Sequence, residues 1–237
     1  MASEVELKLV LLTNDTHDII DHPTLAHYAP ESPVTFDVLN TYFDTPEYNL
    51  LNMGVGLRIR EIEGQFLQTV KTHGKVEAGL HQRAEYSAEL SDAHVDLGKI
   101  NDTHLQQQLT DLVTHKDLAP IFTTHFSRTK WQLLLNDDNH VEVVLDLGEV
   151  RAGEQARAIS EVELEMSKGK AHYALYELAA DLAQVAPIAI EPHSKAWWGY
   201  QLHQAHAEGK TYSAQYDYDV AGPDFFLQQA AELSRRD

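Results

Sequence analysis

The 237-residue sequence has no cysteine, few basic residues and no long apolar run. Without cysteine, the chain can form neither disulfides nor thiol-based catalytic sites, zinc ribbons or iron–sulfur clusters. No apolar run approaches the ~18 residues that a membrane helix needs, and the first ten residues alternate charge where a secretory signal would be apolar. We therefore expect a soluble, cytoplasmic protein.

The charge balance is strongly acidic, with 18 Lys and Arg against 37 Asp and Glu, a net charge of −19. Broad binding of nucleic acid or of an anionic membrane needs a basic face, so we expect neither partner. A small polyanion in a closed site remains compatible with this charge, because a site responds to its local charges and not to the sum. The oligomeric state is left open.

Apolar and polar residues alternate with period two in eight segments, as they do in half-buried strands. These segments are residues 3–11, 35–44, 55–63, 65–72, 80–89, 121–135, 141–151 and 158–167. Short connections, such as Glu63-Gly64 and residues 136–139, are typical of antiparallel hairpins.

Helical periodicity appears at residues 101–118, 170–185 and 195–206, and residues 15–33 read as a short or broken helix because Pro23 interrupts them. Residues 206–223 read as a linker before a final helix at 224–236, which has Asp224 near its N-cap. The order predicts an antiparallel α+β domain over residues 1–205. Residues 206–237 are expected to form a linker and a C-terminal helix, or the start of a further domain.

The polar faces of two predicted strands are unusual because each carries charge of one sign only. Arg58 and Arg60 share one face, and Glu161, Glu163 and Glu165 share another. A face that looks at bulk water explains each strand taken singly, although such a face more often mixes signs. If these faces instead point into a closed barrel, cations ~6 Å apart repel by roughly 3 kcal/mol at an effective dielectric of 20. An anion for the bases and a divalent cation for the carboxylates would relieve that repulsion, as in a site for a metal–polyphosphate complex.

The charged strands carry a series of motifs that resembles the CYTH superfamily, also called triphosphate tunnel metalloenzymes. The first is Glu4-Val5-Glu6-Leu7-Lys8, which matches the E-x-E-x-K signature of that family. In order there follow Tyr42-Phe43-Asp44-Thr45-Pro46, Gly56-Leu57-Arg58-Ile59-Arg60, Thr69-Val70-Lys71, Gly79-Leu80-His81-Gln82-Arg83, Arg128-Thr129-Lys130-Trp131, Leu145-Asp146-Leu147-Gly148-Glu149, Glu161-Val162-Glu163-Leu164-Glu165 and Ser194-Lys195-Ala196. The similarity spans about residues 1–205 and is greatest to bacterial inorganic triphosphatases, whose CYTH domain is commonly followed by a helical CHAD domain.

The resemblance implies a closed eight-stranded antiparallel barrel, the triphosphate tunnel, with helices packed outside over the apolar strand faces. It also implies Mg²⁺ or Mn²⁺, with two ions per site, held by Glu4, Glu6, Asp146, Glu161 and Glu163. The residues implied to bind phosphate are Lys8, Arg58, Arg60, Lys71, Arg83, Arg128, Lys130 and Lys195. Lys8, Glu6 and Glu163 would take the catalytic roles, Lys8 by positioning or helping to activate the attacking water.

The activity implied first is hydrolysis of inorganic triphosphate to phosphate and pyrophosphate. The alternatives are a class IV-type adenylate cyclase, a thiamine or nucleoside triphosphatase, and a non-catalytic module that binds polyphosphate or nucleotide. The 14 histidines are scattered without a metal-binding spacing, so we do not expect them to be metal ligands. His81 is the one that shares the inner face with Arg83. Trp131, Trp197 and Trp198 are expected to pack against other elements and not to stack on a base.

Overall fold

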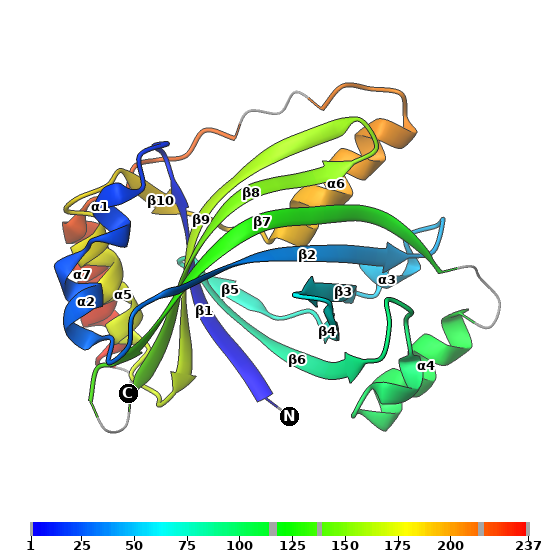
Figure 1. The fold of residues 1–237 in the computed structure, drawn as a ribbon, viewed down its shortest axis with the longest axis horizontal. Coiled ribbons are helices and arrows are strands. Elements are labelled where there is room, and N and C mark those ends of the chain that lie inside the picture. Colours follow the sequence, from blue (N-terminus) through cyan, green and yellow to red (C-terminus); the bar gives the residue numbers. More distant parts are fainter. Residues whose placement is uncertain (1, 114–117, 137–138, 213–215, 236–237) are drawn as a thin grey trace.

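Strand β1 (Ala2–Leu11) closes the sheet, because it pairs with a neighbour on each of its edges. The computed structural model describes residues 2–113, 118–136, 139–212 and 216–235. Within these ranges eight antiparallel strands follow each other around a barrel in the order β1-β9-β8-β7-β2-β3-β4-β6, and β6 pairs back onto β1 (Figure 1). The closed eight-stranded antiparallel barrel expected from the resemblance is confirmed.

The strands agree with the predicted segments to within a few residues. Their bounds are β2 Val34–Asp44, β3 Gly56–Ile62, β4 Gln65–Lys71, β6 Leu80–Leu90, β7 Ala119–Leu134, β8 His140–Ala152 and β9 Gln155–Lys168. Two short strands were not predicted. One is β5 (Lys75–Glu77), which pairs with β6, and the other is β10 (Ile188–Ile190), which pairs with the end of β1. Both have only three residues, too few for a period of two to stand out.

The helices surround this barrel. They are α1 His17–Ile20, α2 Pro23–Tyr28, α3 Asn49–Asn52, α4 Thr103–Val113, α5 Tyr173–Leu182, α6 Lys195–Ala207 and α7 Pro223–Leu233, with a 3₁₀ turn at Leu97–Lys99. The predicted break at Pro23 is confirmed, since Pro23 is the first residue of α2. The helix predicted at 101–118 ends its described part at Val113, and residues 114–117 and 236 lie outside the described residues. Among the described residues, we find no helix with the length and apolar character required to cross a membrane.

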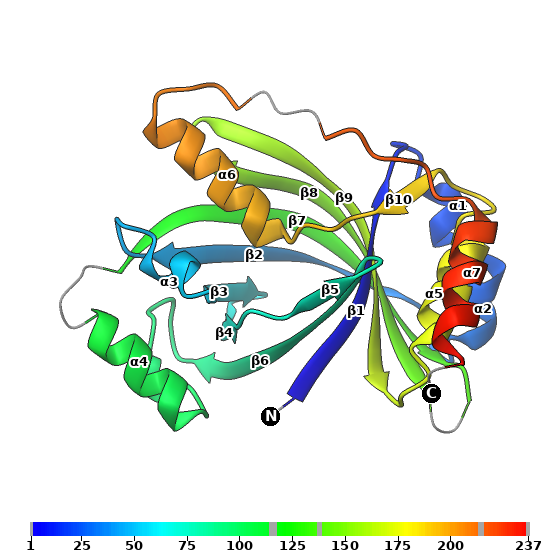
Figure 2. The ribbon, with the colours of Figure 1, turned by 180° about the vertical axis from the view of Figure 1, so that it is seen from behind.

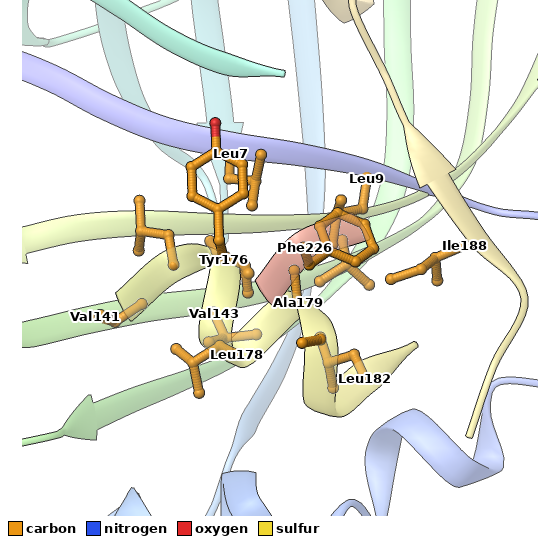
Figure 3. Packing of buried hydrophobic residues seen from close by; sticks show 14 of the residues in the cluster. Leu7, Leu9, Val141, Val143, Tyr176, Leu178, Ala179, Leu182, Ile188 and Phe226 are labelled. Atoms are coloured by element: carbon orange, nitrogen blue, oxygen red, sulfur yellow. The ribbon is translucent and has the colours of Figure 1, made fainter. Parts of the chain in front are cut away.

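The largest apolar cluster lies on the outer face of the barrel, beneath α5 and α7. Leu7 and Leu9 of β1 point outward into a cluster that also contains Leu178 of α5 and Phe226 of α7 (Figure 3). All four side chains are buried, and burying each one stabilises the fold by roughly 1.5–3 kcal/mol. Figures 1 and 2 show α1, α2, α5 and α7 together on this side of the barrel. The apolar strand face therefore points outward under helices, as expected.

A second apolar cluster forms where α6 packs against β7, β8 and β9. Phe122 and Phe126 of β7 lie on the same strand face as Arg128, and they contact Trp198 and Tyr200 of α6. The structure therefore adds to the prediction, because part of the inner face is also apolar. The α6 helix covers that part, and the charged part of the inner face remains open.

Asp44 explains how the loop after β2 is held against α6. Its fully buried carboxylate accepts hydrogen bonds from the backbone N–H groups of Leu50 and Leu51, at 2.9 and 3.0 Å, at the start of α3. It also accepts one from the Tyr200 hydroxyl at 2.8 Å. One carboxylate thus satisfies the free N–H groups of a short helix and fixes α6, which carries Lys195.

Candidate active site

A cavity of about 780 Å³ occupies the charged part of the barrel interior. Side chains from β1, β3, β4, β6, β7, β9 and α6 border it. The predicted site residues on its wall are Glu4, Glu6, Lys8, Arg58, Arg60, Lys71, Arg83, Arg128, Glu163 and Lys195. The structure therefore brings residues from distant parts of the chain into one enclosed space.

Strand register explains why opposite charges face each other there. Glu4 lies opposite Arg83 in the β1–β6 pair, and Lys8 lies opposite Glu163 in the β1–β9 pair. Alternate residues of a strand point to the same side, so Glu4, Glu6 and Lys8 all face inward. Of their outward neighbours, Leu7 and Leu9 belong to the outer cluster, and Val5 is also buried.

Glu4 and Glu6 are held by cations from β4 and β6. Lys71 Nζ lies 2.6 Å from one oxygen of Glu4 and 2.8 Å from the other. Arg83 donates from Nε to Glu4 at 3.0 Å and from Nη2 to Glu6 at 2.9 Å. Burial alone would raise the pKa of Glu4, but Lys71 and Arg83 outweigh it and lower the pKa. Glu4 is therefore ionised at neutral pH.

Glu163 is the centre of a second ion-pair network at the floor of the cavity. It accepts hydrogen bonds from Lys8, from Lys195 at 2.9 Å and from Arg128 at 3.2 Å. Burial would raise the pKa of Glu163, but Lys195, Lys8 and Arg128 lower it well below its usual value. This carboxylate is thus an anion surrounded by three cations.

Two predicted metal ligands, Asp146 and Glu161, are almost fully buried and are not among the residues that border the cavity. Lys195 Nζ lies 2.8 Å from Asp146 and 2.7 Å from Glu161. The structure places both carboxylates behind Lys195, where they hold its ammonium group. One oxygen of Glu161, Oε1, is buried without a hydrogen-bond partner, and burial raises the pKa of this carboxyl despite the opposing effects of Lys195 and Lys8.

Lys130 lies apart from the other predicted phosphate ligands. Its ammonium group pairs with Glu142 at 3.2 Å, and about a third of its side chain remains exposed. Its position near the end of β7 places it beyond Arg128, which is the cation of that strand that borders the cavity.

Lys8 carries a proton at neutral pH. Burial would lower its pKa, but the carboxylates of Glu163 and Glu6 outweigh this effect and raise the pKa. The Lys8 ammonium lies 3.6 Å from Glu6 and also contacts Glu163. In this arrangement Lys8 is a positive charge and a hydrogen-bond donor, and it has no free lone pair with which to accept a proton from water.

Arg58 and Arg60 differ from the other cations because, within the described residues, neither forms an ion pair with a carboxylate. Arg58 donates to the Tyr42 hydroxyl at 3.3 Å, and its Nε is buried without a partner. Arg60 donates to Asn40 at 3.0 Å. Burial, with Arg58 and Arg128 nearby, lowers the pKa of Arg60 to about 9. Burial would lower the pKa of Arg58 too, but Tyr42, Glu85 and Glu4 outweigh it and raise the pKa. Arg60 is therefore the less compensated of the two cations, and a cation of this kind favours the binding of an anion.

Several residues that the sequence analysis did not assign to the site also border the cavity. Tyr42 is stacked on Phe122, and Glu85 lies 2.8 Å from Lys71. Glu85 shares the alternating inner row of β6 with Arg83, so period two was a signal that could have identified it. His81 lies on the same row, donates from Nε2 to the backbone carbonyl of Glu191 at 3.3 Å, and has a pKa lowered by burial and by Lys8. It is therefore neutral at pH 7.

Among the carboxylates that border the cavity, Glu165 is the one whose negative charge nearby cations compensate least. It lies opposite Glu6 in the sheet on one side and opposite Glu142 on the other. Burial and the negative charges of Glu4, Glu6 and Glu142 raise its pKa to about 8. A divalent cation near these carboxylates would remove the repulsion, and carboxylate oxygens are ligands that Mg²⁺ and Mn²⁺ prefer.

The donor chemistry of this wall therefore fits a divalent cation. The crowded Glu165 carboxyl, close to Glu4, Glu6 and Glu142, is the observation that supports the fit. In the described ranges, no three acidic or histidine side chains are arranged as a ready-made ligand group. The carboxylates instead face lysines and arginines, so they would exchange these partners for the metal.

Comparison with known proteins agrees with this architecture. The CYTH domain family matches residues 2–196. An inorganic triphosphatase of Haemophilus influenzae is 33% identical over 215 residues, which is 85% of this chain and 55% of that protein. The chain thus spans about half the length of this curated relative.

Two solved structures share the fold at low sequence identity. One is a Hippeastrum protein described as an adenylyl cyclase candidate with a dominant triphosphatase activity. It has a TM-score of 0.60 and 17% identity, over 90% of this chain and all of that one. The other is a protein from Pyrococcus horikoshii OT3, with a TM-score of 0.50 and 17% identity, over 85% of this chain and 99% of that one. With the closed barrel and the match over residues 2–196, the chain belongs to the CYTH domain family.

Proposed function

We propose that this chain hydrolyses inorganic triphosphate to phosphate and pyrophosphate in the charged cavity, with Mg²⁺ or Mn²⁺ as the cofactor. The observation that carries the proposal is the pair Arg58 and Arg60, two enclosed guanidinium groups without a carboxylate partner among the described residues. They lie in one cavity with Lys71 and Arg83, whose ion pairs with carboxylates could be exchanged for a polyanion.

The arginines suit a chain of phosphates because a guanidinium donates two parallel hydrogen bonds to one phosphate group. Arg58 and Arg60 alternate on β3 and would contact neighbouring phosphates. Lys71, Arg83 and Arg128 would contribute positive charge from the surrounding strands. Hydrolysis of a phosphoanhydride requires mainly positioning and neutralisation of the charge that spreads over the transferred phosphoryl oxygens.

The carboxylates on the cavity wall would hold the metal. Of the predicted ligands, Glu4, Glu6 and Glu163 border the cavity, whereas Asp146 and Glu161 would act from behind by fixing Lys195. We add Glu165 to the candidates because of its crowded position. When bound, Mg²⁺ or Mn²⁺ supplies neutralisation of phosphate oxygens and acidifies a water molecule. Two ions per site remain our proposal.

Lys8 would contribute charge to the reaction and would not remove a proton. Its ammonium group is held between Glu6 and Glu163 and stays protonated at neutral pH. It can donate a hydrogen bond to a terminal phosphate oxygen or to the oxygen of the attacking water. In the balanced reaction, water adds to the terminal phosphorus, the anhydride bond breaks, and pyrophosphate leaves with the shared oxygen.

The relatives support this proposal. The Haemophilus protein is named an inorganic triphosphatase, and this chain is 33% identical to it over a little more than half its length. Triphosphatases of the CYTH family generally depend on a divalent metal, which agrees with the donor chemistry of the wall. The cytoplasmic location and the exclusion of nucleic acid and membrane partners stay predictions, as does the division between residues 1–205 and 206–237.

The proposal is tested by identifying the products. The protein is incubated with tripolyphosphate, ATP or thiamine triphosphate in Mg²⁺ or Mn²⁺, and phosphate, pyrophosphate and cyclic AMP are quantified. We expect phosphate and pyrophosphate in equal amounts, released fastest from tripolyphosphate. Glu6→Gln should abolish turnover, and Glu208→Gln, which alters an exposed carboxylate paired with Lys210, should not. Cyclic AMP as the main product, or binding without turnover, would overturn the proposal.

A further inference from the structure

One part of the cavity wall is formed by aromatic and apolar side chains. Trp197, in the first turn of α6, borders the cavity together with Pro192, His193 and Leu51. This wall adjoins the phosphate-binding region, because Lys195 lies only two residues before Trp197. An inorganic triphosphate has no ring or apolar group that these side chains could contact.

Trp197 differs from the other two tryptophans in its exposure. Trp131 and Trp198 are 2% and 1% exposed, which confirms that they pack against other elements. Trp197 is 36% exposed, although its ring also contacts His193 and Trp198. Adjacent residues of a helix point in different directions, and here Trp198 enters the apolar cluster of α6 while Trp197 reaches the cavity.

The indole of Trp197 is held in place by neighbouring rings. The His193 ring lies against it with centroids 3.9 Å apart at an angle of 30°, and the Trp198 ring meets it at 87°. His193 is itself in contact with Tyr216, at 5.0 Å and 82°. A large side chain that is both partly exposed and fixed by its neighbours loses little entropy when it stacks on a ligand.

The size of the cavity also exceeds what an inorganic triphosphate requires. Its volume of about 780 Å³ lies in the upper part of the roughly 300–1,000 Å³ range of pockets that enclose drug-sized ligands. A triphosphate with a planar organic group would fill more of this space and would bring that group to the wall formed by Trp197 and its neighbours.

We propose that Trp197, backed by His193, is a stacking platform for the base of a nucleoside triphosphate whose phosphates lie on the cations of the same cavity. This inference rests on the proposed function, and it assigns to Trp197 the contact with the ring of an organic triphosphate. Stacking reads the face of a ring and not its hydrogen-bonding edge, so the platform accepts different bases. Trp197 is then a specificity-determining residue, separate from the groups that hold phosphate.

The test compares Trp197→Ala and Trp197→Phe with the unmodified protein, using ATP and tripolyphosphate as substrates. Stacking of a base on an aromatic ring corresponds to a loss of about 5- to 100-fold in affinity when the ring is removed. We expect the KM for ATP to rise in that range in Trp197→Ala and to be largely restored in Trp197→Phe. The kinetic constants for tripolyphosphate should stay the same, because that substrate does not reach the indole.

Tryptophan fluorescence gives a readout that does not depend on turnover. Because Trp131 and Trp198 are buried, ATP added without metal should quench mainly the Trp197 emission, and Trp197→Phe should remove that quenching. Phe225→Ala is the control, since Phe225 is an exposed ring (39%) on α7, which lies away from α6 (Figure 2). It should behave as the unmodified protein does.

The outcomes separate this inference from the proposed function. If tripolyphosphate is hydrolysed but Trp197→Ala leaves the KM for ATP unchanged, the platform is refuted and the proposed function stands. A parallel rise for both substrates also refutes the platform, because it indicates a general structural role for the indole. If tripolyphosphate is not hydrolysed, the proposed function fails, and the quenching by ATP still decides whether Trp197 binds a base.

Discussion

Arg128 and Asp146 form a two-point ion pair between β7 and β8, with Nε and Nη2 of the guanidinium each 2.7 Å from a different oxygen of the carboxylate. The two residues are opposite each other in the strand register, and Asp146 is fully buried. The same carboxylate lies 2.8 Å from Lys195. One buried anion therefore fixes two cations on the wall of the cavity.

Removing that anion should destabilise the protein strongly. Asp146→Asn leaves Arg128 and Lys195 buried with less counter-charge, and breaking a buried pair in this way costs about 3–5 kcal/mol. Unfolding in urea measures the loss. The control is Glu149→Gln, which removes an exposed partner of Arg151 and should change the free energy of unfolding by less than about 1 kcal/mol. Equal stability of the two variants would contradict the structural role of Asp146.

Unlike Asp146, Arg60 should not stabilise the folded protein when substrate is absent. Burial and the charges of Arg58 and Arg128 lower its pKa to about 9, so the ionised form is already disfavoured. Because an unfolded arginine binds its proton more tightly, the folded state is destabilised at all pH values below about 9, and this cost falls as the pH rises further. We expect Arg60→Gln to retain the melting temperature at pH 7, whereas Arg128→Gln should lower it.

The same substitution should weaken binding of tripolyphosphate. Hydrogen bonds to charged groups contribute about 1.5–3 kcal/mol, which corresponds to roughly a 10- to 100-fold change in affinity. Steady-state kinetics of Arg60→Gln should show a KM raised in that range. A lower melting temperature together with an unchanged KM would indicate that Arg60 serves the fold and not the substrate.

Glu165 gives a prediction about pH. Its pKa is about 8 in the folded protein against an ordinary 4.5, because of burial and of the carboxylates of Glu4, Glu6 and Glu142. Between these values the folded state binds more protons than the unfolded state, so stability falls as the pH rises from about 5 to 8. Glu165→Gln should raise the melting temperature in the absence of divalent ions by roughly 2–4 °C for each kcal/mol of repulsion removed.

The gain from Glu165→Gln should be larger at pH 8.5 than at pH 6, because the native carboxyl is ionised only at the higher pH. Added Mg²⁺ should reduce the difference between the variant and the unmodified protein at pH 8.5, since the cation compensates the charge. A gain that is independent of pH would show that the effect comes from packing and not from ionisation.

Much of the barrel could be predicted from the sequence, because alternation of polar and apolar residues is a local property. It identified the strands and placed Glu4, Arg58 and Arg83 each on the polar face of its own strand. Alternation says nothing about which strands pair, so the closure of β1 onto β6 followed from the family resemblance alone. The apolar row that Phe122 and Phe126 form beside Arg128 was not foreseen, since it depends on α6 packing against that face.

The sequence indicated which residue types form the candidate site, but not how deeply each side chain is buried. Asp146 and Lys130 both lie on strands that carry charge, yet Asp146 is fully buried and Lys130 lies near a strand end. Depth depends on the tilt and length of the strands in three dimensions, which a period of two does not contain. The position of Trp197 also required the structure, because two consecutive tryptophans in a helix give no sign of which one faces the cavity.

The most direct test of the account is a crystal structure of the protein with tripolyphosphate. We predict that the phosphates lie in the cavity within hydrogen-bond distance of Arg58 and Arg60, and that Lys71 and Arg83 turn partly from Glu4 toward the anion. Tripolyphosphate bound elsewhere on the protein, with the Lys71 and Arg83 ion pairs intact and the two arginines of β3 untouched, would contradict the central claim.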